Sequence, residues 1–137
     1  MEKNSTADPD LGPYDATRFA NLALGLDAAL CNVAGLVFTL TGAFMSDWLG
    51  VAGWIATLFG VVIMFWSFVV TLFANRKVAR RSELEFVAKA NIAFVIAAIV
   101  VIAIPDTMTT AGKTLLAAGA AVVAAFAAAQ LYARKTL

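Results

Sequence analysis

Asp27 is the residue whose type and position best suit it to chemistry, because it is the one charged residue in the apolar stretch 19–45. A carboxylate at the centre of a membrane costs about 2.5–3.5 kcal/mol on insertion scales, and such residues usually mark functional sites. Two amides, Asn91 and Gln130, also lie inside long apolar stretches. The three residues predict an intramembrane polar cluster that either binds a proton or cation or joins helices together.

This cluster is expected in the half of the membrane nearer to the chain termini. Asp27 lies nine residues after Arg18, Asn91 lies near the start of its segment, and Gln130 lies near the end of its own. A neutral carboxyl would donate to an amide oxygen, whereas an ionised one needs water or a cation. Interhelical hydrogen bonds in membranes average only about 0.6 kcal/mol, so both roles stay open. Asn32 lies about 140° around the helix from Asp27, at about 100° per residue, so one partner is not expected to serve both.

Four long apolar segments must position these side chains. Residues 51–74 and 114–133 contain no charged residue, 19–45 contains only Asp27, and 90–104 is extended by 86–88 around Lys89. About 20 apolar residues cross about 30 Å of hydrocarbon as a helix. The apolar content of 62% also exceeds the roughly 45–50% of soluble domains. We therefore expect an all-α membrane protein: a disordered polar N-terminal tail at 1–14, then a four transmembrane helix antiparallel bundle at 15–135, with spans at about 18–45, 51–75, 83–104 and 107–133.

The basic residues predict the orientation of this bundle. Nine of the ten Lys and Arg residues lie before the first span, at the connection between the second and third, or after the fourth, and Lys113 alone lies on the other side. The positive-inside rule then places the N and C termini in the cytoplasm, for a multi-pass protein of the cell (plasma) membrane. Trp48 and Trp54 are expected at the outer interface, with Tyr14 and Tyr132 near the inner one.

Helix-end signals support the spans. Asp15, after a proline, is expected to cap the first helix, and Ser82 with Glu85 predicts a capping box at the start of the third. Pro105 should end that helix, and Asp106 or Thr107 should cap the fourth.

Small residues predict which helix faces meet, because helices in lipid associate by close backbone packing. The second span carries one such stripe and the fourth another: Gly53, Ala56, Gly60, Ser67 and Thr71, and then Ala117, Ala121, Ala125 and Ala129. We expect the fourth span, which is small on nearly every side, to be central. The bulky residues Phe65, Phe68 and Phe94 are expected to face lipid.

Composition argues against several functions. The net charge of +1 argues against a nucleic-acid partner, and the lack of His argues against a haem or zinc site built on imidazole. Cys31 is the single cysteine, and no Ser or Cys has a plausible base partner. We expect no enzyme activity, no cofactor and no metal.

Short motifs across residues 20–131 resemble a known group of proteins. They are LGLDAA at 24–29, GL at 35–36, Asn91 followed by the aromatic Phe94, TAG at 110–112 and FAAAQ at 126–130. Together they resemble uncharacterised four-span integral membrane proteins that are common in actinobacteria. The resemblance implies that Asp27, Asn91 and Gln130 belong together, and it implies no activity.

Two function classes remain. One is a non-enzymatic membrane protein, an accessory subunit or assembly factor that presents its small-residue stripes to another membrane protein or to itself within the lipid bilayer. The other is a small transporter or channel that uses Asp27 for a proton or cation. A membrane enzyme is the least favoured alternative.

The orientation gives a direct prediction. A reporter fused after residue 137 should give a cytoplasmic signal, and one inserted at 46–50 should give an external signal, because the basic residues hold their side in the cytoplasm. Paired phosphatase and fluorescent-protein fusions measure this. An external C terminus would show that the predicted topology is wrong.

Overall fold

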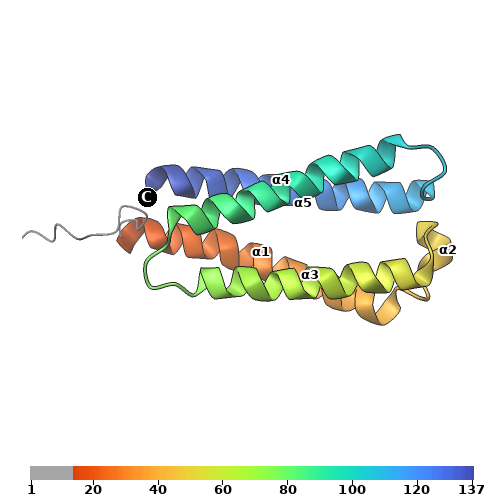
Figure 1. The fold of residues 1–137 in the computed structure, drawn as a ribbon, viewed down its shortest axis with the longest axis horizontal. Helices are drawn as coiled ribbons and strands as arrows, with labels where there is room; N and C mark the ends of the chain where they lie inside the picture. Colours follow the sequence, from red (N-terminus) through yellow and green to blue (C-terminus); the bar gives the residue numbers. More distant parts are fainter. Residues whose placement is uncertain (1–13) are drawn as a thin grey trace, which may run out of the picture.

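The computed structural model describes residues 14–137 of the chain, and this part is helical without strands (Figure 1). Its helices are α1 (Tyr14–Thr41), α2 (Ser46–Leu49), α3 (Gly53–Ala74), α4 (Arg81–Ala103) and α5 (Thr110–Thr136). Among the described residues, four helices are long and apolar enough to cross a membrane. The expected fold class of a four-span all-α membrane protein is therefore confirmed. The expected tail lies outside the described residues except for Tyr14, which begins α1.

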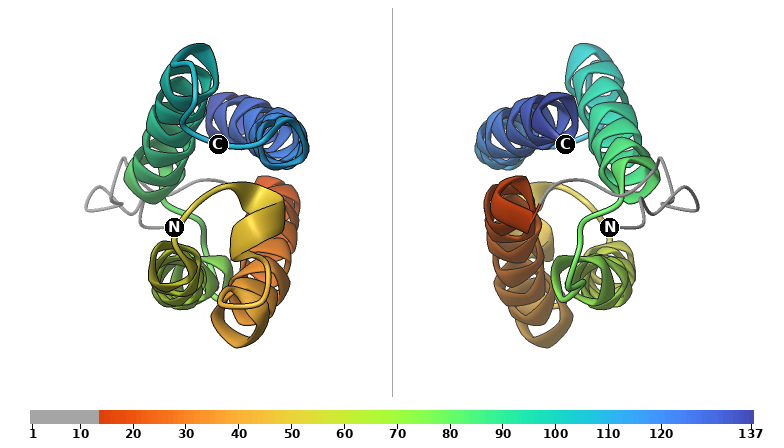
Figure 2. Two further views of the ribbon diagram at one scale, coloured as in Figure 1. Left: turned by 90° about the vertical axis from the view of Figure 1, so that its right-hand side faces the viewer. Right: turned by 90° about the vertical axis from the view of Figure 1, so that its left-hand side faces the viewer.

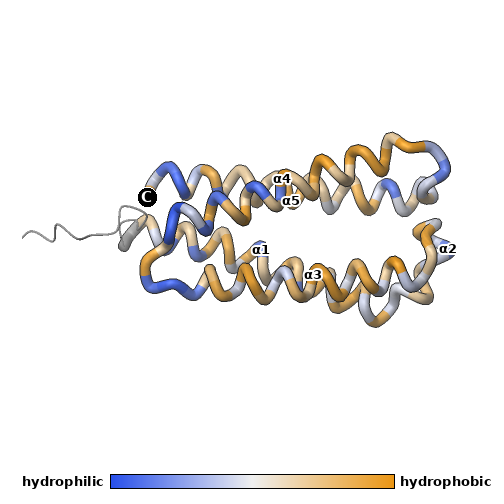
Figure 3. The backbone as a smooth tube through the Cα atoms, viewed as in Figure 1, coloured by the Kyte–Doolittle hydropathy of each residue, from blue (hydrophilic) through white to orange (hydrophobic). Residues whose placement is uncertain are grey.

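The long helices form two antiparallel hairpins. α1 packs along α3, α4 packs along α5, and the hairpins meet mainly where α1 faces α5, as the end views of Figure 2 show. The start of α1 and the end of α5 lie at the same end of the bundle (Figure 1). Apolar residues colour most of every long helix, while the polar ones gather at the loops and at this terminal end (Figure 3).

Glycines allow α1 and α3 to cross at close range. A Cβ atom on Gly60 would lie 2.5 Å from the backbone nitrogen of Thr39 and 2.7 Å from the carbonyl oxygen of Gly35. Ala56, Gly60 and Ser67 are buried in this contact, so the central part of the predicted stripe on the second span does pack against a neighbour. Thr71, at the end of the stripe, is exposed.

The prediction that the small-residue stripe of the fourth span packs against other helices of the chain is wrong. Ala117, Ala121 and Ala125 are exposed, and α5 packs mainly beside α4 and α1, with the short helix α2 at one end, rather than at the centre. α5 carries small residues on nearly every side, so side-chain size does not determine which of its faces is buried. The buried face is the one that carries a polar anchor, and its members are Gly112, Ala120, Ala127, Gln130 and Ala133.

The aromatic side chains follow the expectations only in part. Phe65 and Phe68 are exposed on α3 by 71% and 61%, as expected for lipid-facing residues. Phe94 is instead half-buried, because its ring stacks on that of Phe59 with centroids 6.2 Å apart. This contact joins α4 to α3 across the two hairpins.

The loop between α4 and α5 caps both helices, although not with the residues predicted. α4 ends at Ala103 before Pro105, as expected. The N-cap of α5 is Thr109, whose hydroxyl accepts a hydrogen bond from the Gly112 nitrogen at 3.0 Å. Asp106 and Thr107 were the expected caps, but the Thr107 hydroxyl donates instead to the carbonyl oxygens of Val101 and Ile104, at 2.9 and 3.0 Å. These bonds satisfy carbonyl groups that the end of α4 leaves free.

The start signals of α1 and α4 are also displaced. α1 begins at Tyr14, so Asp15 lies inside its first turn. α4 begins at Arg81, and its N-cap Arg80 makes no side-chain cap bond. The predicted capping box does not form, because Glu85 pairs with Lys89 and with Arg134 of α5, and its carboxylate is no longer available to the helix end.

The short helix α2 joins the two hairpins at the end of the bundle opposite the start of α1. α1 ends at Thr41 rather than at 45, and the chain then turns into α2. The Thr109 nitrogen donates to the Leu49 carbonyl oxygen at 3.1 Å, and the Thr109 hydroxyl donates to the carbonyl of Trp48. Gly50 makes this approach possible: its φ of +78° suits glycine, and a Cβ there would lie 2.5 Å from the Thr109 nitrogen.

Candidate functional site

The structure brings the side chains of Asp27, Asn91 and Gln130 into mutual contact. The Asp27 Oδ2 atom accepts hydrogen bonds from Asn91 Nδ2 at 2.8 Å and from Gln130 Nε2 at 2.7 Å. Asn91 Nδ2 also donates to Gln130 Oε1 at 3.0 Å. We call these three residues the polar triad. Its members come from α1, α4 and α5, so the triad connects the first hairpin to both helices of the second.

The triad is buried within the bundle. Asp27 is exposed by 1%, Asn91 by 4% and Gln130 by 0%. The largest buried apolar side chains near it, Leu24 of α1 and Val87 of α4, lie one turn toward the terminal end and belong to the main hydrophobic core. Because water and lipid are both excluded, each hydrogen bond of the triad contributes more to stability than it would at the surface. Losing a partner would leave a buried polar atom without a hydrogen bond.

Cys31 is a fourth contact that sequence reasoning did not assign to the cluster. Its Sγ atom lies 3.5 Å from the Oδ1 atom of Asp27, within the range of a weak thiol donor. The signal was present in the sequence, because residues four apart on a helix lie on the same face. Both oxygens of the carboxyl therefore have a donor.

The hydrogen-bond pattern defines the chemistry available to the triad. In all three contacts Asp27 is the acceptor, and no Lys or Arg of the described chain pairs with it. An ionised carboxylate suits three donors, whereas a protonated one must donate and would require Asn91 or Gln130 to turn its carbonyl oxygen toward it. The triad can therefore hold a proton by rotating an amide. In the described part of the chain, no three His, Cys, Asp or Glu side chains gather as a metal site.

Asn32 lies apart from the triad, as the helical angle predicts. Its side chain is exposed on the other face of α1, whereas Asp27 is buried on the inner face. The two residues lie five positions apart on α1 but in different environments. This difference makes Asn32 a natural comparison for the amides of the triad.

Comparison with known proteins returned no family model, no curated protein and no solved structure that matches this chain. The geometry of the bundle is therefore the basis for the functional argument.

The triad predicts that its amides are essential to stability and that Asn32 is not. Asn91→Ala should lower the free energy of unfolding by about 1–3 kcal/mol, because Asp27 and Gln130 each lose a donor in a buried site. Asn32→Ala removes the same group from an exposed position and should change it by less than about 0.5 kcal/mol. Steric trapping of the chain in lipid bicelles measures both. Equal losses for the two variants would contradict the structural role assigned to the triad.

Proposed function

We propose that this chain is a non-enzymatic membrane protein that binds another membrane protein as an accessory subunit or assembly factor. In this proposal it lies in the cell membrane with both termini in the cytoplasm, as its basic residues favour. The resemblance to uncharacterised four-span proteins of actinobacteria is part of the same proposal. The observation that carries it is the uncovered small-residue face of α5.

That face is suited to a second helix. Ala117, Ala121 and Ala125 are exposed along it. Close backbone approach, which such residues permit, is what drives helix association in lipid. A helix face that contacts only lipid makes more van der Waals contact through bulky side chains, such as Phe65 on α3, than through alanine. We call the face that contains Ala117, Ala121 and Ala125 the α5 outer face.

The triad supports this proposal by fixing the rotation of α5. Ala121 lies about 180° around the helix from Gln130, at about 100° per residue. When Gln130 turns inward to Asp27, the α5 outer face must therefore turn outward. The buried carboxylate then has a structural purpose, which is to present one defined surface of an otherwise uniform helix.

The test is site-specific crosslinking in intact membranes. A photoreactive residue at Ala121 should give one discrete crosslinked product, whereas the same residue at Phe65, which is exposed on α3, should give none. A bulky Ala125→Trp change should abolish the product without lowering the thermal stability of the purified chain, since position 125 is exposed. A product of twice the chain's mass would identify a second copy as the partner. Equal labelling from positions 121 and 65 would contradict the proposal.

Transport of a proton or cation is the second candidate, and one observation favours it. Asp27 is buried against three donors, and no basic side chain of the described residues neutralises it. Acidic residues inside membrane spans commonly mark proton or ion pathways. Two surface cavities lie between α1 and α3, and Asp27 lines neither of them.

Asp27→Asn separates the two candidates. If Asp27 carries a proton or cation, vesicles containing the purified wild-type chain should show pH-linked flux, and the variant should show none while remaining folded in detergent. Asp106→Asn, which removes a carboxylate from the loop between α4 and α5, should leave the flux unchanged. Absence of flux from the wild-type chain under proton, sodium and potassium gradients would reject transport and leave the structural role.

A further inference from the structure

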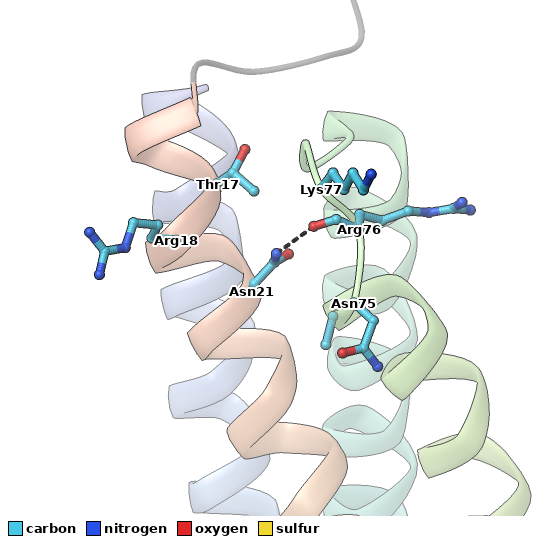
Figure 4. A pocket seen from close by; sticks show the side chains of 7 residues that line it. Thr17, Arg18, Asn21, Asn75, Arg76 and Lys77 are labelled. Atoms are coloured by element: carbon cyan, nitrogen blue, oxygen red, sulfur yellow. Dashed lines mark hydrogen bonds between the residues drawn. The ribbon is translucent and has the colours of Figure 1, made fainter.

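A pocket opens between α1 and α3 at the terminal end of the bundle (Figure 4). The basic connection between α3 and α4 forms one wall, and the Asn21 Nδ2 atom donates to the Arg76 carbonyl oxygen at 2.7 Å. The Ala79 nitrogen donates to the Thr17 hydroxyl at 2.9 Å, which fastens the same connection to α1 a second time. The pocket thus has a fixed shape. Its lining is Thr17, Arg18, Asn21, Ala74, Asn75, Arg76 and Lys77.

The charge around this pocket is positive. The lining contains three basic residues and no acidic one. Arg76 is already neutralised, because its guanidinium makes hydrogen bonds of 2.9–3.2 Å to both carboxylate oxygens of Glu83, and this pairing raises its pKa. Arg18 and Lys77 make no ion pair with any residue that the structure describes. Lys77, on the connection, therefore keeps a positive charge at the opening that no described residue pairs, whereas the Arg18 side chain extends from the side of α1 that faces away from the connection (Figure 4).

A groove continues from this pocket along the surface of α1 and α3. The two cavities share Asn21, Ala74 and Asn75, and the groove ends at Asn32 and Met64. Eleven residues separate Asn21 from Asn32, which is about 16 Å at about 1.5 Å per residue. This length matches half of a hydrocarbon core of about 30 Å, and therefore one leaflet of a bilayer.

The walls of the groove accept an apolar occupant despite their hydroxyl groups. The Ser67 hydroxyl donates to the Met64 carbonyl oxygen, and the Thr71 hydroxyl donates to the Ser67 carbonyl oxygen, both at 2.7 Å. These groups are satisfied by their own helix and need no polar ligand. Gly25 provides the space, since a Cβ atom there would meet nothing within 4 Å.

We propose that this pocket and groove bind one anionic phospholipid of the cytoplasmic leaflet. Its phosphate lies at the mouth of the pocket beside Lys77, and one acyl chain lies along Gly25 in the groove. Charge complementarity selects the headgroup, because anionic lipids attract basic residues at this side of a membrane. The one-leaflet length of the groove selects a lipid over a free anion, which would occupy the pocket alone. This site rests on the proposed orientation, with the termini in the cytoplasm, but it uses a different surface from the α5 outer face and does not depend on the proposed partner.

Native mass spectrometry of the full chain in detergent, with added phosphatidylglycerol or phosphatidylcholine, tests the headgroup. Phosphatidylglycerol should bind more tightly, and Lys77→Gln should weaken its binding roughly fivefold, as expected for one basic residue near an anionic lipid. Lys135→Gln removes the same charge at the same end of the bundle but outside the pocket, and it should leave binding unchanged. Equal binding of the two lipids, or equal effects of Lys77→Gln and Lys135→Gln, would overturn the proposal.

A second comparison tests the groove. Gly25→Phe should fill it and weaken phosphatidylglycerol binding at least as much as the loss of one charge does. Gly119→Phe, which places the same ring at another open glycine on α5, should not. Inorganic phosphate at millimolar concentration should fail to displace the lipid. If phosphate displaces it and Gly25→Phe has no effect, the pocket binds a free anion and the lipid assignment is wrong.

Discussion

The arrangement of the bundle depends on two hydrogen bonds donated by amides to one buried carboxyl group. Asn91 and Gln130 both donate to Asp27, and in doing so they hold both helices of the second hairpin against the first. In hydrocarbon a polar side chain gains more from such a partner than from any apolar contact, because its alternative is an unsatisfied group. The triad therefore sets which faces of α1, α4 and α5 turn inward, and the apolar residues pack around that choice.

The sequence was sufficient to predict this cluster, because hydrocarbon tolerates so few polar groups that their depths alone bring Asp27, Asn91 and Gln130 together. It was not sufficient to orient α5. Alanine and glycine occur on all sides of that helix, so residue size alone does not distinguish the stripe from Ala117 to Ala125 from the other faces of α5. The rotation follows from the position of Gln130, whose hydrogen bond to Asp27 joins residues that are 103 positions apart in the sequence.

Local signals also failed where a distant partner competed for the same group. Glu85 has the spacing of a capping-box residue, but a basic residue on α5, Arg134, lies within 3.1 Å of it in the folded chain. Thr107 likewise follows a proline in the manner of an N-cap, yet the free carbonyl groups at the end of α4 lie within reach of its hydroxyl. In both cases the sequence identified a polar side chain that stabilises a helix end or loop, and the three-dimensional contacts decided its partner.

The chain order of the triad has a consequence for biosynthesis. Asp27 belongs to the first hairpin, whereas its donors are 64 and 103 residues later in the chain. At about 5–20 residues per second, the ribosome needs roughly 5–20 s to make the segment between Asp27 and Gln130. During that interval the first hairpin carries a carboxyl group whose two amide partners, Asn91 and Gln130, do not yet exist. The nascent hairpin must therefore stay in a watery or chaperoned site, or hold the carboxyl in its neutral form, until the second hairpin enters the membrane beside it.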